Sequence, residues 1–192
     1  MDYGHLKPAM EIVNSNITTK YLIGIDEVGR GPLAGPVTLG CFKVEVTNMK
    51  KVYSALKGIT DSKKLSAKRR TQYYLKIKEL QQQGLLDFSI SHVAASVIDT
   101  KGITYAITTA IHRSLNKVNA SPEETEVFLD GGLWCNPSYS QETIIKGDQK
   151  NWLIGAASVV AKVRRDALMV RKGRGYPEYG FERHKGYGTK YH

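Results

Sequence analysis

Apolar residues gather in short runs that are separated by glycine, proline and polar residues. The first run, from Tyr21 to Asp26, predicts a largely buried β-strand, and the run from Pro36 to Val46 predicts the next one. Because only a short turn rich in glycine and proline separates the two strands, we expect an antiparallel hairpin. Gly29, Gly31 and Gly35 are expected to supply the unusual backbone angles of that turn.

A helix, a strand and a second helix are predicted in the middle of the chain. Residues 67–83 are rich in strong helix formers, with Ser66 placed to cap the helix and Gly84 placed to end it. Leu85 to Val93 alternates as a third strand. The second helix has one buried face, marked by apolar residues at spacings of three and four: Ile103, Ile107, Ala110, Ile111, Leu115 and Val118.

The last third of the chain repeats the opening pattern. The run from Glu126 to Leu129 predicts a strand that ends in Asp130 and two glycines, and Thr143 to Ile145 predicts a short further strand. A helix is expected over residues 151–171, with a loop-like segment beyond Gly173. Small side chains would let this helix pack closely on the sheet: Gly155, Ala156, Ala157, Ser158 and Ala161. The pattern favours an α/β fold in one domain.

Four acidic residues lie at predicted strand ends or at a helix start. Asp26 and Glu27 follow a buried strand, where neighbouring carboxylates repel each other and lose hydration unless a cation lies between them. Asp130 ends another strand, and Asp148 lies near the start of the long helix. If the four converge, their oxygens suit Mg²⁺ or Mn²⁺, and two such ions could drive phosphodiester hydrolysis. Taken singly, the first pair also fits a turn cap, and Asp148 fits a helix cap equally well.

The charge balance favours a polyanionic partner. Among 192 residues, 28 Lys and Arg face 18 Asp and Glu, which gives a net charge of +10. Charge alone does not distinguish DNA from RNA or an acidic membrane, and many soluble basic proteins share this balance. Near the C-terminus, aromatic and basic residues interleave: Tyr176, Tyr179, Phe181, His184, Lys185 and Tyr187. This mixture suits stacking on sugars or bases with phosphate contacts, although aromatics packed on the core give the same pattern.

The sequence predicts neither a membrane protein nor an exported one. Residues 1–19 form a polar arm without an apolar signal core, and no apolar run approaches the roughly 18 residues that a bilayer span needs. Cys41 and Cys135 lie far apart and lack the histidine spacing of a zinc site, which fits a reducing compartment. We therefore expect a cytoplasmic protein, and a monomer, because no oligomerisation stripe is left over.

Several short motifs follow one another along the chain: DEVGRGPLAGPV at 26–37, DSKKL at 61–65, Asp130-Gly131, Lys146-Gly147-Asp148, AAS at 156–158 with AKV at 161–163, and HKGY at 184–187. In sequence and in order, they resemble the motifs of prokaryotic ribonuclease HII. The resemblance covers roughly residues 20 to 190. Because several independent motifs agree, chance is a poor explanation for the match.

The resemblance implies a ribonuclease H-like fold, in which helices flank a central mixed five-stranded sheet. It implies an endonuclease that cleaves the RNA strand of RNA/DNA hybrids and cuts on the 5′ side of ribonucleotides embedded in duplex DNA. The products would carry a 3′-hydroxyl and a 5′-phosphate. Such an enzyme would remove ribonucleotides and RNA primers from DNA, using two Mg²⁺ or Mn²⁺ ions.

The resemblance also assigns roles to residues of this chain. Asp26 would be shared by both metal ions, with Glu27, Asp130 and Asp148 completing the catalytic site. The turn of Gly29, Arg30 and Gly31 would approach the ribonucleotide and read its 2′-hydroxyl, which is the group that distinguishes RNA from DNA. Tyr187 would contact the same hydroxyl and pack on the adjacent deoxyribose. The lysines that lie in matching motifs are candidate substrate contacts: Lys63, Lys64, Lys146, Lys162 and Lys185.

One departure and two rival classes remain. Family members commonly continue past the HKGY loop with a further helix and a basic segment, whereas this sequence stops at His192 within the expected substrate-contacting segment of residues 173–192. A non-catalytic nucleic-acid-binding protein would explain the charge but not four acids that repel a polyanion. Another metal-dependent nuclease, or an integrase-like enzyme, would explain the acids but not the combination of Gly-Arg-Gly with tyrosine.

Overall fold

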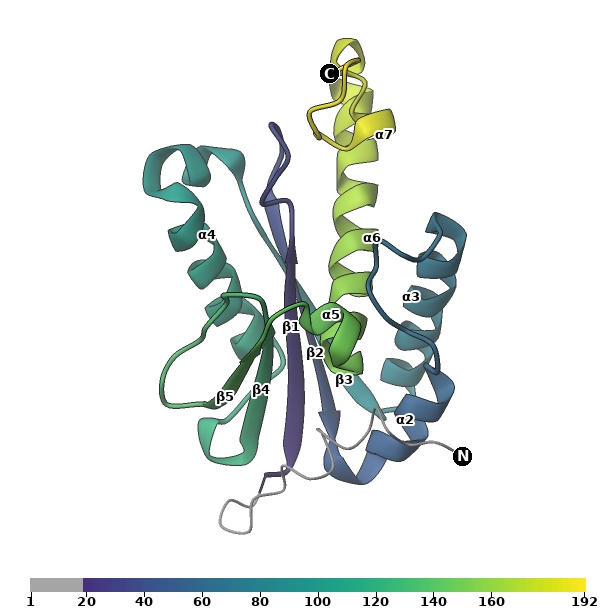
Figure 1. The fold of residues 1–192 in the computed structure, drawn as a ribbon, viewed down its shortest axis with the longest axis vertical. Helices are drawn as coiled ribbons and strands as arrows, with labels where there is room; N and C mark the ends of the chain where they lie inside the picture. Colours follow the sequence, from purple (N-terminus) through teal and green to yellow (C-terminus); the bar gives the residue numbers. More distant parts are fainter. Residues whose placement is uncertain (1–18) are drawn as a thin grey trace.

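A mixed five-stranded sheet forms the centre of the molecule (Figure 1). The computed structural model describes residues 19–192, and the strand order is β3-β2-β1-β4-β5. The strands are β1 (Tyr21–Val28), β2 (Val37–Glu45), β3 (Leu86–Val93), β4 (Thr125–Asp130) and β5 (Ser140–Ile144). β1, β2 and β3 pair antiparallel, whereas β4 is parallel to both β1 and β5. The predicted hairpin and the predicted mixed sheet are both confirmed.

Helices cover both faces of the sheet (Figure 1). They are α2 (Met49–Ala55), α3 (Ala67–Gln82), α4 (Ala95–Lys117), α5 (Gly147–Lys150), α6 (Trp152–Gly175) and α7 (Phe181–His184). Short 3₁₀ turns join some of them: η1 (Val46–Asn48), η2 (Pro122–Glu124) and η3 (Pro177–Tyr179). α4 lies on one face, whereas α6, with α3 and α2 beside it, lies on the other. α6 continues beyond the sheet and carries α7 near its far end.

The alternation of side chains along β1 divides the core into two layers. Leu22 packs with the residues of α6 and α3, whereas Ile23 and Ile25 pack against the apolar face of α4. The stripe predicted for α4 is confirmed, because it packs throughout into this second layer. By the same alternation, Asp26 follows Leu22 toward the α6 side.

Glycines of the sheet allow α6 to approach it closely. A Cβ atom on Gly24 would lie 2.2 Å from the carbonyl carbon of Leu153, and one on Gly40 would lie 2.2 Å from the carbonyl oxygen of Ala157. These distances are far shorter than van der Waals contact. The predicted close packing of α6 is confirmed, but the sheet contributes to it as much as the small residues of the helix do.

Some boundaries differ from the sequence prediction. α4 begins at Ala95 and is interrupted at Gly102, which has φ of 84°. The segment beyond Gly173 is not simply a loop, because it contains the end of α6, η3 and α7. α2 was not predicted, and β5 starts earlier than Thr143. The predicted cap is confirmed, since the Ser66 hydroxyl accepts a hydrogen bond from the amide of Arg69.

Two further expectations concern the chain as a whole. The predicted N-terminal arm lies outside the described residues apart from residue 19. None of the helices between residues 19 and 192 combines the length and the apolar character that a bilayer crossing requires.

Candidate functional site

Three of the four predicted acids meet where β1 and β4 end. The two strands are parallel neighbours, with Ile25 paired to Leu129, so Asp26 and Asp130 follow at the same edge of the sheet. Carboxylate oxygens of Asp26, Glu27 and Asp130 all lie within 4.8 Å of one another. This spacing is short enough for one cation to contact all three side chains.

Backbone amides hold two of these carboxylates in place. Asp26 Oδ1 accepts a hydrogen bond of 2.7 Å from the amide of Glu27. Asp130 Oδ1 accepts bonds from the amides of Gly147 at 2.6 Å and Asp148 at 3.4 Å. The carboxylate of β4 is thereby tied to the first turn of α5, which fixes the position of Asp148 relative to the other acids.

Burial and mutual repulsion make the cluster unfavourable in its fully charged form. The pKa of Asp26 is raised well above its ordinary value by burial first and by the charges of Glu27, Asp130 and Asp148, while the nearby Ser158 hydroxyl opposes the shift. Burial and Asp130 also raise the pKa of Glu27. A cation at this position would offset both effects, as the sequence argument expected.

Asp148 lies beside the three-acid group but is not part of it. It is buried in α5, and its pKa is raised to about 6 by burial, by Asp61 and by Asp130. It does not cap the long helix, because that role belongs to Asn151, whose side-chain oxygen accepts a 2.9 Å hydrogen bond from the amide of Leu153. Its carboxyl group therefore remains available for other chemistry.

Asp61 is a further acid that the sequence argument did not select for the site. It is 5% exposed, its Oδ1 accepts a bond from the amide of Lys63, and its Oδ2 accepts one from the side chain of Gln149. The sequence signal for it is the DSKKL motif, whose lysines alone were expected to have a role. The loop places Asp61 close enough to raise the pKa of Asp148.

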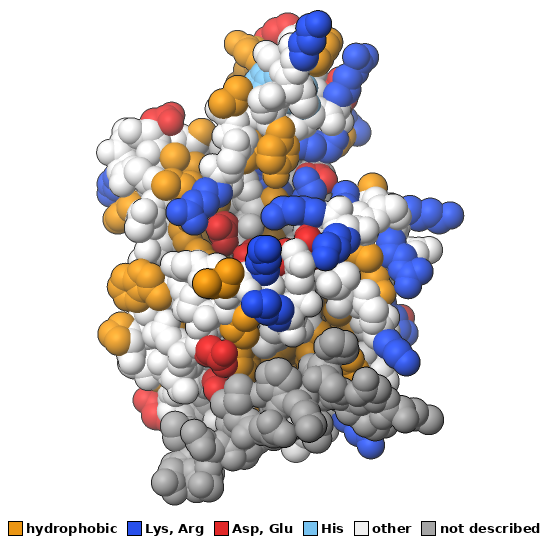
Figure 2. Space-filling model, viewed as in Figure 1, with side chains coloured by type: hydrophobic (Ala, Val, Ile, Leu, Met, Phe, Trp, Pro, Cys, Tyr) orange, Lys and Arg blue, Asp and Glu red, His pale blue; other side chains and the backbone are white. Residues whose placement is uncertain are grey.

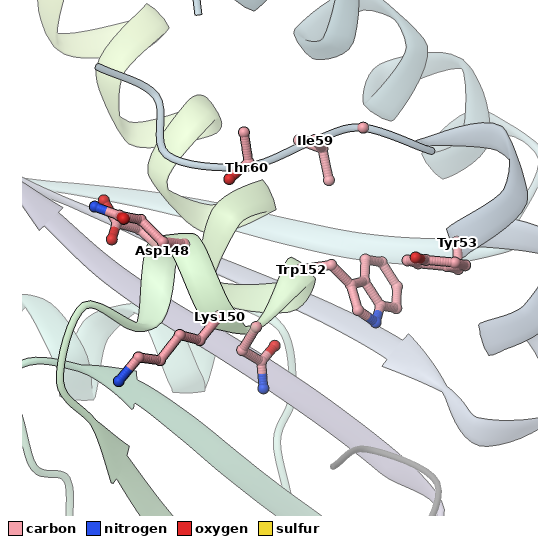
Figure 3. Close-up of a pocket in the computed structure, with 9 residues that line it drawn as sticks. Tyr53, Ile59, Thr60, Asp148, Lys150 and Trp152 are labelled. Atoms are coloured by element: carbon pink, nitrogen blue, oxygen red, sulfur yellow. The ribbon is translucent and has the colours of Figure 1, made fainter. Parts of the chain in front are cut away.

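A cavity of about 230 Å³ adjoins Asp148 (Figure 3). Asp148 lies at one end, Ile59 and Thr60 lie along one side, and Trp152 and Tyr53 lie at the other end. The two aromatic rings meet edge to face with centroids 5.5 Å apart. The cavity extends the acidic site toward the connection between α2 and α3.

The Gly-Arg-Gly turn follows β1 directly. Gly29 and Gly35 have φ of 101° and 95°, so the predicted need for glycine holds at these positions. Gly31 is not among the residues with positive φ, and nothing lies within 4 Å of the Cβ it lacks, so the expectation of an unusual angle was wrong there. Arg30 Nη1 lies 3.7 Å from Glu27 Oε1, which places the guanidinium at the edge of the acids.

Arg165 joins this turn to the HKGY loop. Its side chain is fully buried and donates hydrogen bonds to the carbonyl oxygens of Pro36 at 3.0 Å, Ala34 at 3.2 Å and Lys185 at 2.9 Å. The amide of Leu33 also donates to the Gly186 carbonyl at 2.9 Å. Sequence reasoning missed Arg165, because a basic residue on a long helix ordinarily indicates a solvated face.

Tyr187 is half-buried against α6. Lys162 Nζ lies 5.3 Å from the centroid of its ring, and the guanidinium of Arg165 lies 5.7 Å from it. Lys162 also forms a 2.8 Å ion pair with Asp166. Lys162 therefore supports the tyrosine, and its charge is already paired within the helix.

The other predicted lysines differ in exposure. Lys63, Lys64 and Lys146 are exposed, whereas Lys185 is half-buried. The charge of Lys63 reaches the acids, since it lowers the pKa of both Glu27 and Asp148. Figure 2 shows the result on this face, where blue side chains surround a few red ones at the centre. The acids thus lie within a basic surface.

Comparison with known sequences identifies relatives along nearly the whole described chain. The family model for ribonuclease HII matches residues 23–192. The ribonuclease HII of Clostridioides difficile is 42% identical over 172 residues, covering 90% of this chain and 63% of the relative. That of Bacillus pumilus is 43% identical over 171 residues, covering 89% and 62%. The chain thus spans somewhat less than two thirds of the length of these relatives.

Solved structures show the same fold. Ribonuclease H2 from Pyrococcus horikoshii superposes with a TM-score of 0.69 at 23% identity, covering 88% of this chain and 82% of that one. RNase HII from Archaeoglobus fulgidus, solved in complex with PCNA, superposes with a TM-score of 0.66 at 20% identity, with the same coverage. The ribonuclease H-like fold is therefore confirmed. Together with the family match over residues 23–192, it shows that this chain belongs to the ribonuclease HII family.

Proposed function

We propose that this protein is an endoribonuclease that hydrolyses the RNA strand of RNA/DNA hybrids and cuts on the 5′ side of ribonucleotides embedded in duplex DNA. The observation that carries the proposal is the meeting of Asp26, Glu27 and Asp130 within 4.8 Å, inside a basic surface and next to the Gly29–Gly31 turn. Membership of the ribonuclease HII family supports the same reaction. Products with a 3′-hydroxyl and a 5′-phosphate would follow.

The donor set fits hard divalent cations. Carboxylate oxygens are the ligands that Mg²⁺ and Mn²⁺ prefer, and a bound cation would offset the burial and mutual repulsion that raise the pKa values of Asp26 and Glu27. Asp26, Glu27, Asp130 and Asp148 would hold the ions. Two such ions, when bound, supply an activated water and stabilise the leaving oxygen. The fixed hydrogen bonds of Asp26 and Asp130 keep these carboxylates oriented without further ordering.

Selection of the ribonucleotide would rest on the two loops that Arg165 joins. The backbone of Gly29 and Gly31 can approach a ribose closely, and Arg30 can exchange its contact with Glu27 for a phosphate. The ring of Tyr187, held between α6 cations and the same loops, would pack on the neighbouring sugar. A 2′-hydroxyl provides the donor and acceptor that this arrangement reads.

The test is cleavage of a labelled DNA duplex that carries one ribonucleotide. The duplex is incubated with Mg²⁺, with Mn²⁺ or with chelator, beside an all-DNA duplex and an RNA/DNA hybrid. We expect a single metal-dependent cut on the 5′ side of the ribonucleotide and no cut in the all-DNA duplex. Asp26→Asn should lose activity by a factor of about 10³ or more, since it removes a negative charge that both ions need.

The matched control is Glu79→Gln, which removes an acid from the exposed side of α3, where Glu79 contacts Lys76. This variant should keep full activity. Tight duplex binding without a cut in either metal would overturn the proposal in favour of a non-catalytic binding protein. Cutting of the all-DNA duplex would indicate a different nuclease on this fold.

A further inference from the structure

A second cleft lies on the α4 side of the acidic site. Its volume is about 90 Å³, and it is lined by the Gly-Arg-Gly turn, by α4 and by the connection between β4 and β5. Its polar rim consists of Arg30, Thr104 and Thr108, and its aromatic wall is Trp134. We call it the Trp134 cleft. Arg30 links it to the acidic site, because this residue lines the cleft and lies 3.7 Å from Glu27.

Trp134 is exposed on a backbone that is held rigidly. The side chain is 57% exposed, whereas its neighbours Leu133 and Cys135 are buried. Thr143 Oγ1 donates to the Leu133 carbonyl at 3.0 Å, and the amide of Cys135 donates to Gln141 Oε1 at 2.8 Å. The indole is therefore presented to solvent at little further cost in conformational entropy, as in aromatic anchors of binding surfaces.

The surroundings of the cleft suit a sugar–phosphate backbone. An indole face packs on sugars or bases without regard to sequence, threonine hydroxyls bond to phosphate oxygens, and Arg30 supplies positive charge. An apolar protein partner would not require the Arg30 cation at the rim, whereas a polyanion would.

We propose that the Trp134 cleft binds the sugar–phosphate backbone of the duplex beside the cleaved bond, with Trp134 packed on a sugar. The inference rests on the proposed function, because the occupant is the same duplex that reaches the acids. The cleft would add affinity without taking part in the chemistry. Its contribution should therefore appear in Kd and KM rather than in the reaction step.

The chain offers a direct spectroscopic readout. It has two tryptophans, of which Trp152 is buried and Trp134 is exposed. In chelator, so that no cleavage occurs, addition of a duplex with one ribonucleotide should change the Trp134 emission and reduce its quenching by acrylamide. Trp134→Phe should lose this signal and retain duplex affinity to within about twofold, because a ring remains.

Affinity and kinetics give the second measurement. Trp134→Ala should raise Kd for the duplex about fivefold or more, the low end of the effect of removing a stacking aromatic. The loss should appear in KM more than in kcat. The matched control is Leu75→Ala, which removes an apolar side chain of the same exposure, 58%, from α3. Circular dichroism melting of each variant reports whether it folds.

The possible results distinguish failure of the proposed duplex binding by the Trp134 cleft from failure of the proposed function. Normal cleavage with unchanged Trp134 emission and equal Kd for Trp134→Ala and Leu75→Ala overturns the cleft while the proposed function stands. A duplex that changes Trp134 emission but is never cut in Mg²⁺ or Mn²⁺ supports the cleft and overturns the function. If Trp134→Ala keeps duplex affinity but loses self-association in sedimentation, the occupant is a second copy and the proposal is wrong.

Discussion

Asp26 and Glu27 are adjacent in sequence, yet each is held by a different set of neighbours. Asp26 follows the α6 face of β1 and accepts a hydrogen bond from the Glu27 amide, whereas the Glu27 side chain faces Arg30 across 3.7 Å. Their charges are costly because both side chains lose hydration and face other acids. Asp26 and Glu27 therefore lower the stability of the metal-free fold, which is the usual cost of residues that serve function.

The cost of these buried charges predicts how the stability of the metal-free protein depends on pH. The folded state raises the carboxyl pKa of Asp26, and that of Asp148 to about 6, so it holds protons that the unfolded chain has already released. The free energy of unfolding contributed by these groups should therefore fall as pH rises from about 4 through 6 and beyond. Urea unfolding in chelator across this range measures the effect.

Asp26→Asn tests whether the buried charge of Asp26 destabilises the metal-free protein. The uncharged amide removes the buried charge, so we expect this variant to be more stable than the wild type at pH 7 by roughly 1 kcal/mol, or about 3 °C in Tm. The gain should shrink as pH falls, because the wild-type carboxyl then takes up a proton and loses its buried charge. A variant that is less stable than the wild type at pH 7 would show that Asp26 is not strained in the metal-free state.

At the scale of elements, α6 organises the site. One side of it approaches β1 and β2 across Gly24 and Gly40, and its outer half carries Arg165 and the cations beneath Tyr187. Ser158 lies on the same helix and lowers the pKa of Asp26. A single helix thus sets the distance between the acids and the two loops.

Close packing at Gly24 gives a stability prediction. Gly24→Ala would place a methyl group 2.2 Å from the backbone of Leu153, so α6 must shift, and we expect a loss of about 3 kcal/mol or more. Gly175→Ala is the control, since nothing lies within 4 Å of the missing Cβ at the end of α6. Thermal melting compares them. Equal melting temperatures of Gly24→Ala and Gly175→Ala would contradict the prediction, because they would show that α6 can move away from the sheet without loss of stability.

Arg165 gives a prediction about the loops. Arg165→Met removes three hydrogen bonds and leaves three carbonyl groups without their donor, which should cost about 3 kcal/mol or more. Hydrogen exchange should increase at residues 33–36 and 184–187. Arg165→Lys should restore part of the stability. Arg164→Met is the adjacent control, because that exposed side chain bonds only to the hydroxyl of Tyr74 among the described residues.

At the scale of the whole molecule, positive charge surrounds a small negative centre. The net charge of +10 predicts that duplex affinity falls steeply with salt. Each of Lys63→Gln, Lys64→Gln and Lys146→Gln should reduce the slope of log K against log salt by about 0.9, if the lysine contacts a phosphate. Lys162→Gln should change it less, because Lys162 is paired with Asp166. Fluorescence anisotropy gives the duplex Kd at salt concentrations from about 50 to about 300 mM, and the slopes follow from these values.

The strands, the hairpin and the acids could be predicted because their signals are local, whereas the mixed five-stranded sheet was expected only from the family resemblance. An apolar run from Tyr21 to Asp26 and an acid at the end of each buried run suffice for the local features. Arg165, Asp61 and Trp134 were missed because their roles depend on contacts between distant segments. Gly24 was missed because the sequence shows an apolar strand there but not the helix that crosses it.

The link between Arg165 and Ala34 spans 131 residues of sequence, and it has a consequence for the order in which the site forms during translation. β1 and its acids leave the ribosome early, whereas the Gly-Arg-Gly turn gains its buried partner only after α6 has been made. The HKGY loop joins them later still. Under the proposed function, a nascent chain would therefore carry the acidic cluster before the pair of loops that select a ribonucleotide, and discrimination of ribose from deoxyribose would be the last property to mature.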